Sequence, residues 1–229
     1  MFTRNLIFNQ ERGQAATGIA IVQADGRFDI LKQPIQADKF TALPQYQHMM
    51  TRIGAHTTLI LGHTRLPTKG DPRHPENNHP IVADHVLGVH NGHIHNDDEL
   101  FQRYAYPRHA GVDSEIIFRM IAALSPLNTN GSYLHAVRQR LRLLRGQFTF
   151  LAVDLHKPQQ LILLKHRNPL CLHFHAEWNA LFFSSRYIFL RKTFGRVILT
   201  ETLPHDRVLL FDALRLPALG SQPAESCPL

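Results

Sequence analysis

Apolar and polar residues follow one another along this chain in blocks that predict short strands towards both ends and helices between them. β-Branched and apolar runs over residues 17–22, 57–62 and 86–90 are typical of buried strands. The pair Asp25-Gly26 after the first run predicts a hairpin into a strand over residues 27–31. A second group of short apolar runs predicts strands over residues 148–153, 161–164, 170–174, 180–183 and 207–211.

The predicted helices cover residues 37–50, 113–121, 131–144 and 187–194, and another begins at Asp97 with Asn96 as its N-cap. Residues 69–80 are polar and rich in proline, which predicts a loop. Helices grouped between strands favour an α+β fold with antiparallel sheets over a regular alternation of strands and helices. We expect a single domain over residues 1–216 and a flexible tail over residues 217–229, which are rich in Pro, Ser and Gly.

Composition limits the class of protein. The chain is 44% hydrophobic, enough for a core that needs neither disulfides nor metals, and its two cysteines favour a reducing compartment. No run is long enough for a signal peptide or a membrane-spanning helix, so we expect a cytoplasmic protein without a membrane partner. The net charge of +7 is scattered, and no nucleic-acid partner is expected. The densest basic group predicts a solvated or partner-facing helix surface: Arg138, Arg140, Arg142 and Arg145.

Arg65 is a candidate ligand for a carboxylate. It follows a predicted strand within Gly62-His63-Thr64-Arg65, and Thr68 comes three residues later. A guanidinium presents a planar pair of donors that matches a carboxylate, and the Thr68 hydroxyl adds another donor. The alternative for Arg65 is a surface arginine at the end of a strand.

Asn91 and Gly92 are candidates for stabilising an oxyanion. The Asn91 amide and the Gly92 backbone N–H can converge on one oxygen, and glycine allows a close approach of the backbone. Asn-Gly is also a common turn dipeptide, so this pair alone is weak evidence. Asp113 is a candidate carboxylate for an ammonium group, although it also suits the start of a helix.

Several segments, in this order, resemble those of class II glutamine amidotransferases, which use an N-terminal cysteine to release ammonia from glutamine. The similar segments are residues 12–20 (Arg-Gly-Gln-Ala-Ala-Thr-Gly-Ile-Ala), 62–70, 77–80, 89–94, 112–115, 167–170 and 180–185. The resemblance implies the four-layer αββα sandwich of N-terminal-nucleophile hydrolases. It also implies that Arg65 and Thr68 bind the carboxylate of glutamine, that Asn91 and Gly92 form the oxyanion hole, and that Asp113 binds the ammonium. No cofactor is implied.

The chain departs from this family at three places. Leu66 stands where the family often has an aromatic residue, and Lys69 where it often has a histidine. The third is the nucleophile: residue 2 is Phe2, and only eleven residues precede Arg12, too few for the family's first strand and helix. Three explanations stay open, namely a start codon placed too late, a truncated and inactive product, or a pocket that binds without hydrolysing.

The cysteines and histidines suggest no substitute chemistry. Cys171 lies in an apolar strand and is expected to be structural, and Cys227 lies in the tail. Among the 16 histidines, the group His90, His93 and His95 lacks the spacing of a zinc motif, so no metal site is expected.

The sequence therefore predicts a domain that binds glutamine. With a cysteine upstream of Met1 it would hydrolyse glutamine to glutamate and ammonia through a thioester. The alternative is a catalytically inactive binding or interaction protein that keeps the pocket. No ammonia-acceptor domain fits in the chain, so an acceptor such as a synthetase is expected on another polypeptide.

Overall fold

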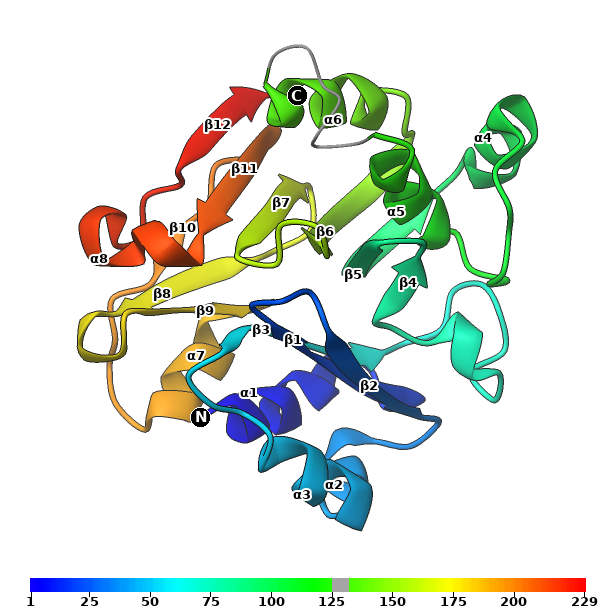
Figure 1. Cartoon of the computed structure of the whole chain (residues 1–229). Helices are drawn as coiled ribbons and strands as arrows, with labels where there is room; N and C mark the ends of the chain where they lie inside the picture. Colours follow the sequence, from blue (N-terminus) through cyan, green and yellow to red (C-terminus); the bar gives the residue numbers. More distant parts are fainter. Residues whose placement is uncertain (125–131) are drawn as a thin grey trace.

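The computed structural model describes residues 1–124 and 132–229, which form a four-layer αββα sandwich (Figure 1). The helices are α1 (Phe2–Asn9), α2 (Ala37–Thr41), α3 (Pro44–Met50), α4 (Asp97–Tyr104), α5 (Glu115–Ala122), α6 (Tyr133–Leu141), α7 (Tyr187–Phe194) and α8 (Leu216–Leu219). The strands are β1 (Ala16–Gln23), β2 (Phe28–Gln33), β3 (Thr57–Arg65), β4 (Ile81–Ala83), β5 (Val86–Ile94), β6 (Gly146–Asp154), β7 (Gln160–His166), β8 (Cys171–His175), β9 (Ala180–Ser184), β10 (Glu201–Thr202), β11 (Arg207–Asp212) and β12 (Glu225–Pro228).

The strands form two layers, and every pairing among the described residues is antiparallel. One layer is a sheet of order β12-β11-β7-β6-β5-β4, and the other contains the sheets β2-β1-β3 and β10-β8-β9. In the first layer β5 pairs with β6 along its whole length, from Val86 opposite Asp154 to Ile94 opposite Gly146. The α+β class and the layered sandwich expected from the sequence are confirmed.

The alternation of side chains along the strands explains the layers. In β1, Ile19 and Ile21 face α1, α2 and α3, whereas Ala20 and Val22 face the other β layer. The outer face of the six-stranded sheet is covered by α5 and α6, whose apolar side chains pack on β6, β7 and β11. Each β layer is therefore apolar on both faces, as a sheet in the middle of a four-layer sandwich must be.

Several predicted elements differ from the structure in their bounds. The helix expected over residues 37–50 is divided into α2 and α3, and Pro44 stands in the first turn of α3. A proline suits a first helical turn but cannot continue a preceding helix, because its ring clashes with the turn before it. Residues 187–194 form α7 as predicted. Strand β4 was missed.

Asn96 stands at the N-cap of α4, as the sequence predicted, but its side chain forms no capping bond. Its Nδ2 donates to the Leu143 carbonyl at 2.9 Å, and its Oδ1 accepts from the Arg145 N–H at 2.9 Å. The amide therefore ties the start of α4 to the segment between α6 and β6.

The helix that was expected over residues 131–144 is shorter in the described structure. Gly131, where that helix was expected to begin, lies outside the described residues, and α6 covers Tyr133–Leu141. Within residues 217–229, β12 pairs with β11, while the flexibility of this segment stays a prediction. Arg138 of α6 donates to the Pro228 carbonyl, and Arg140 lies over the Tyr104 ring. No helix in the described part of the chain has the length and apolar character needed to cross a bilayer.

A buried ion-pair network holds the segment that leads into α5. Arg119 has a side chain only 1% exposed; its Nε donates to Glu115 at 3.0 Å and its Nη1 to Asp84 at 2.8 Å. Glu115 also accepts the backbone N–H groups of His109 and Ala110. The network thereby attaches the loop before α5, which contains Asp113, to the turn between β4 and β5.

We expect Arg119→Leu to lower the free energy of unfolding by about 3–5 kcal/mol, because it leaves the Glu115 carboxylate buried without its cation. Urea unfolding followed by circular dichroism measures this. Arg142→Leu is the matched control, since Arg142 is exposed on the same layer of helices and should change stability by less than about 0.5 kcal/mol. Equal effects of the two substitutions would contradict the stabilising role of the network.

Candidate functional site

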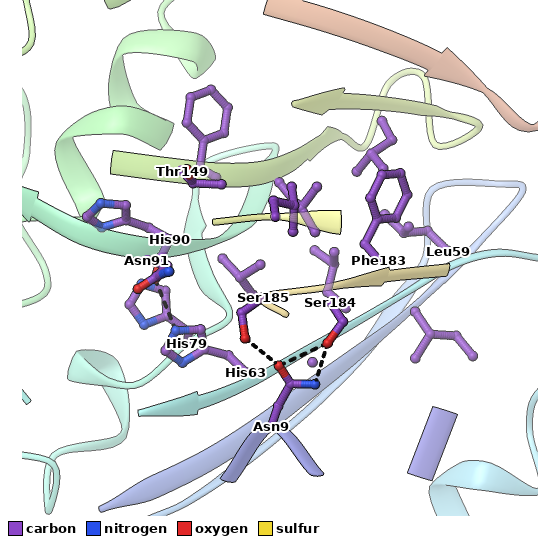
Figure 2. A pocket seen from close by; sticks show the side chains of 18 of the residues that line it. Asn9, Leu59, His63, His79, His90, Asn91, Thr149, Phe183, Ser184 and Ser185 are labelled. Carbon is purple, nitrogen blue, oxygen red and sulfur yellow. Dashed lines mark hydrogen bonds between the residues drawn. The ribbon is translucent and has the colours of Figure 1, made fainter. Parts of the chain in front are cut away.

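A cavity of about 1030 Å³ opens between the two β layers. The candidate residues predicted from the sequence all line it, although they come from three separate segments of the chain: Arg65, Thr68, Asn91, Gly92 and Asp113. Side chains from α1 and β9 line the same cavity, and Figure 2 shows part of its wall. The structure therefore brings the predicted residues together rather than placing them on different faces.

Arg65 ends β3 and is 4% exposed. Its Nη1 donates to the Asn78 side chain at 2.8 Å, and its Nη2 donates to the carbonyls of Lys69 and Gly70 at 2.6 and 2.8 Å. The guanidinium therefore shapes the loop over residues 66–70. Because Nη2 already serves two carbonyls, a paired contact with a ligand carboxylate requires one of these bonds to be exchanged for the ligand.

The loop after Arg65 presents Thr68 and Lys69 at the rim of the cavity. Thr68 is exposed, so its hydroxyl is accessible to a ligand. Lys69, at one of the positions where the chain departs from the family, donates from Nζ to Asp97 at 2.6 Å and to Asp98 at 3.1 Å. It therefore links the loop to the start of α4. Leu66, the other departure in this loop, is 71% exposed.

Asn91 and Gly92 lie within β5 and not in the turn that the dipeptide suggested. The strand continues to Ile94 because β6 pairs with it that far. Gly92 has φ 143°, and a Cβ there would lie 1.8 Å from the Gln147 carbonyl oxygen of β6, so only glycine fits. The Asn168 side chain donates to the Asn91 carbonyl at 2.9 Å and fixes this part of the strand.

The Asn91 side-chain Nδ2 is buried and has no hydrogen-bond partner among the described residues. A buried donor without a partner costs about 1–3 kcal/mol. Asn91 lines the cavity, so a ligand or water there can accept its hydrogen bond. This is the arrangement that stabilisation of an oxyanion requires, namely a positioned and unused donor.

Asp113 is 3% exposed and lies two residues before α5. Its Oδ2 accepts the backbone N–H of Ile94 at 2.6 Å, and His93 Nδ1 is 3.6 Å away. The carboxylate thus contacts the end of β5 and does not cap α5, which was the alternative from the sequence. Burial raises the pKa of Asp113, against the opposing effect of the Ile94 N–H bond.

Three histidines gather beside Asn91, namely His63 of β3, His79 of the loop before β4, and His90 of β5 (Figure 2). The His63 and His79 ring centroids are 4.3 Å apart, and those of His79 and His90 are 6.3 Å apart. His63 Nε2 must carry a proton, because it donates to the His90 carbonyl at 3.0 Å. Nitrogens of all three rings are buried without a partner among the described residues.

Burial keeps these imidazoles neutral. It lowers the pKa of His63 and of His90 to about 3, and that of His79 well below its usual value. The His90 Nδ1 is 2.8 Å from the Ser114 hydroxyl, which links β5 to the start of α5. The cluster therefore lines the cavity with neutral rings and unused nitrogens that suit a polar ligand.

A second polar network fixes α1 at the cavity. The Asn9 Nδ2 donates to the Ser184 hydroxyl at 2.9 Å, and the Ser185 hydroxyl donates to Asn9 Oδ1 at 2.7 Å (Figure 2). The Thr64 hydroxyl donates to the Asn9 carbonyl at 2.8 Å. These contacts join α1, β3 and β9 around one side of the hollow.

The two cysteines lie elsewhere. Cys171 is on β8 and Cys227 on β12, and neither is among the described residues that line the cavity. Burial raises the pKa of both thiols, which disfavours the reactive thiolate. The structure thus agrees with the expectation that Cys171 is no substitute nucleophile.

Sequence reasoning missed the histidine cluster, Asn168 and the Asn9 network. Each of the three histidines stands inside one of the segments that resemble the family, but only His90 was considered, as a metal ligand together with His93 and His95. The available signal was their positions, His63 two residues before Arg65, and His79 and His90 directly before Pro80 and Asn91. The sequence offered no signal for the Asn9 network, because Ser184 and Ser185 are more than 170 residues from Asn9.

The neutral histidines predict a stability that falls with acid. The unfolded chain binds protons to these rings below about pH 6.5, whereas the folded chain excludes them until about pH 3. Each buried ring should therefore cost about 1 kcal/mol of unfolding free energy between pH 6.5 and 5.5. His90→Asn, whose amide can reach Ser114, should flatten this dependence by about that amount in urea titrations. An unchanged slope would contradict the assignment.

Comparisons with known proteins agree with this architecture. The glutamine amidotransferase domain model matches residues 63–192. The glutamine–fructose-6-phosphate aminotransferase of Aliivibrio fischeri is 26% identical over 164 residues, which cover 70% of this chain and 25% of the relative. That of Yersinia pestis is 27% identical over 164 residues, covering 70% and 26%. The chain thus spans about a quarter of the length of these relatives.

Solved structures share the fold at lower identity. The glutamine phosphoribosylpyrophosphate amidotransferase from B. subtilis superposes with a TM-score of 0.71 and 16% identity, covering 99% of this chain and 45% of that chain. A glutamine aminotransferase class-II domain protein from Silicibacter pomeroyi gives a TM-score of 0.54 and 14% identity, covering 93% and 90%. With the family match over residues 63–192, the chain belongs to the glutamine amidotransferase domain family, of the class II, N-terminal-nucleophile type.

Proposed function

We propose that the chain binds L-glutamine in the cavity lined by Arg65, Asn91 and Asp113. The observation that carries the proposal is the convergence, in one hollow, of a buried cation, an unused amide donor and a buried carboxylate. An α-amino acid presents a carboxylate and an ammonium, and these need opposite charges at fixed positions. The names of the relatives, which are glutamine-dependent enzymes, point to the same ligand.

In this proposal Arg65 and Thr68 bind the α-carboxylate. The Arg65 Nη2 exchanges a loop carbonyl for the ligand, and the loop over residues 66–70 adjusts as the ligand enters. Asp113 Oδ1 accepts a hydrogen bond from the α-ammonium, while Oδ2 keeps its hydrogen bond from the Ile94 N–H. Burial lowers the pKa of Arg65, and the charge of Asp113 opposes this effect.

Hydrolysis of the side-chain amide would use other residues of the pocket than those that bind the α-carboxylate and the α-ammonium. Asn91 Nδ2 and the Gly92 N–H would stabilise the oxyanion of the tetrahedral intermediate, at about 3 kcal/mol for each donor. The attacking thiolate would come from a cysteine on a segment upstream of Met1, next to α1, whose residues Phe2 and Asn5 line the cavity. The thiolate would displace ammonia to form a thioester, and water would then release glutamate.

The second candidate is a binding or interaction protein that keeps the pocket without hydrolysis. The positions of Cys171 and Cys227 outside the cavity favour it for the chain as it stands. An in-frame cysteine codon just upstream of Met1 would favour the enzyme, and a stop codon there would favour the binding protein. If the chain hydrolyses glutamine, the acceptor of the ammonia would lie on other sequence, since the chain spans about a quarter of the length of its relatives.

Asp113→Asn tests the ammonium contact. We expect it to weaken glutamine binding about 10–150-fold, because a charged hydrogen bond contributes about 1.5–3 kcal/mol. It should leave unchanged the affinity for glutaramate, which lacks the α-ammonium. Calorimetry with both ligands measures this, and equal losses for both would contradict the role of Asp113.

Arg65→Lys tests the carboxylate contact while keeping the charge. We expect it to lower the affinity for glutamine at least tenfold, because the lysine ammonium cannot replace the planar donor pair of arginine. Arg65→Ala should abolish detectable binding. Arg52→Ala is the control, since Arg52 is an exposed arginine paired with Asp29 outside the cavity lining, and it should bind like the parent. Unchanged affinity in Arg65→Ala would remove the assignment of this pocket.

We also expect the purified 229-residue chain to release no glutamate from glutamine by a cysteine-dependent route. Alkylation of its thiols with iodoacetamide should leave glutamine affinity unchanged, since neither cysteine lines the cavity. A coupled glutamate dehydrogenase assay measures release. Turnover that alkylation abolishes would contradict this expectation and would assign a catalytic thiol within the chain.

A further inference from the structure

A second group of polar side chains lies at the other end of β5. Asp154 ends β6 opposite Val86, His85 immediately precedes β5, and His156 lies in the turn after β6. Six residues separate His85 from Asn91, which corresponds to about 20 Å at the rise of a strand. None of these three residues lines the cavity described above, among the residues that the structure places there. The group is thus separate from the proposed glutamine pocket.

Asp154 is a buried carboxylate with incomplete compensation of its charge. It is 2% exposed, and no lysine or arginine of the described chain forms an ion pair with it. Its Oδ1 accepts the His156 backbone N–H at 2.9 Å, and its Oδ2 accepts the Tyr133 hydroxyl at 3.0 Å. A buried carboxylate without a cation is costly, so these two hydrogen bonds leave room for a further stabilising partner.

Two imidazoles face this carboxylate. His85 Nε2 is 3.7 Å from Asp154 Oδ2, and His156 Nδ1 is 3.1 Å from Oδ1. His85 Nε2 is buried and has no hydrogen-bond partner among the described residues. One ligand atom from each residue lies within 4.8 Å of the others, and the ring centroids are 4.3 Å apart.

We propose that His85, Asp154 and His156 form a binding site for a divalent transition-metal ion of the zinc class. Ligands about 2.1 Å from a tetrahedral zinc ion lie about 3.4 Å from one another. Each histidine nitrogen is near this distance from one of the two Asp154 oxygens, His85 Nε2 at 3.7 Å from Oδ2 and His156 Nδ1 at 3.1 Å from Oδ1. Two imidazole nitrogens and one carboxylate oxygen are ligands that zinc accepts, and a water would complete four-coordination. The ion supplies the positive charge that the buried Asp154 lacks.

The surroundings support a structural role for the ion. The Leu155 backbone N–H donates to the His85 carbonyl at 2.8 Å, so the two turns that carry the histidines are already in contact. Tyr133 of α6 donates its hydroxyl hydrogen bond to the Asp154 carboxylate. Residues that orient metal ligands make hydrogen bonds of this kind. An ion would therefore join two turns of the six-stranded sheet.

The site was not foreseen from the sequence, where only His90, His93 and His95 were considered as ligands. His85 and His156 are 71 residues apart and carry no local spacing motif. Their proximity depends on the β5–β6 register, which places Val86 opposite Asp154.

Zinc titration of the full chain, freed of any affinity tag and treated with a chelator, tests the proposal. Calorimetry and mass spectrometric metal analysis after dialysis should give about one zinc ion per chain. Cobalt(II) should give the visible absorption of a four-coordinate site. A zinc concentration one hundred times the Kd should raise the melting temperature by about 5–10 °C, because the ion binds the folded chain.

Substitutions then locate the ion. His85→Ala and His156→Ala change partly exposed residues, so they should fold, and each should weaken zinc binding at least tenfold. Asp154→Asn keeps an acceptor for Tyr133 and should have the same effect. The control is the double substitution of His173 and His175 by alanine, a histidine pair on β8, which should leave zinc affinity unchanged. Unchanged zinc affinity in both single histidine variants, or loss only in the control, would overturn the site.

Discussion

The hydrogen bond between the Ile94 backbone N–H and the Asp113 carboxylate is the contact on which the arrangement of the cavity depends. It joins the end of β5 to the segment before α5, and these carry different parts of the candidate site. Asn91 and Gly92 are fixed because they belong to β5, and Asp113 is fixed because Glu115 and Arg119 hold the following turn. Together with the contact between His90 and Ser114, it holds the carboxylate and the amide donors in one frame.

The site is polar where a stable core would be apolar. Buried ring nitrogens of His63, His79 and His90 and the Asn91 amide have no partners among the described residues, and each unmet donor or acceptor lowers stability. The surrounding layers offset this with extensive apolar packing of α5 and α6 on the six-stranded sheet. Unused polar groups in a rigid setting are what a pocket needs in order to recognise a polar ligand.

The sequence could predict those parts of the fold that have a local cause. Apolar runs predicted most strands, and residues 187–194 form a helix with the predicted bounds. Asn91-Gly92 was harder, because the dipeptide favours a turn and only its pairing with β6, remote in sequence, makes it a strand. The same limit applies to the hydrogen bond from Arg65 to the Gly70 carbonyl, because Gly70 lies in an irregular loop. It also applies to the Asn9 network, because Asn9 and Ser184 lie far apart along the chain. Resemblance to a family supplied the candidate residues, whereas their contacts required the structure.

Strand β5 explains why the chain has two separate polar centres. Leu87 and Val89, in the first half of the strand, are buried between the β layers together with Val153 and separate the two centres. One end carries Asn91 and Gly92 beside Asp113, and the other meets the turns that hold His85 and Asp154. The β5–β6 register is continuous over nine residue pairs, from Val86 opposite Asp154 to Ile94 opposite Gly146. A one-residue slip would turn every side chain of β5 to the opposite face, so this one register fixes the residues of both centres.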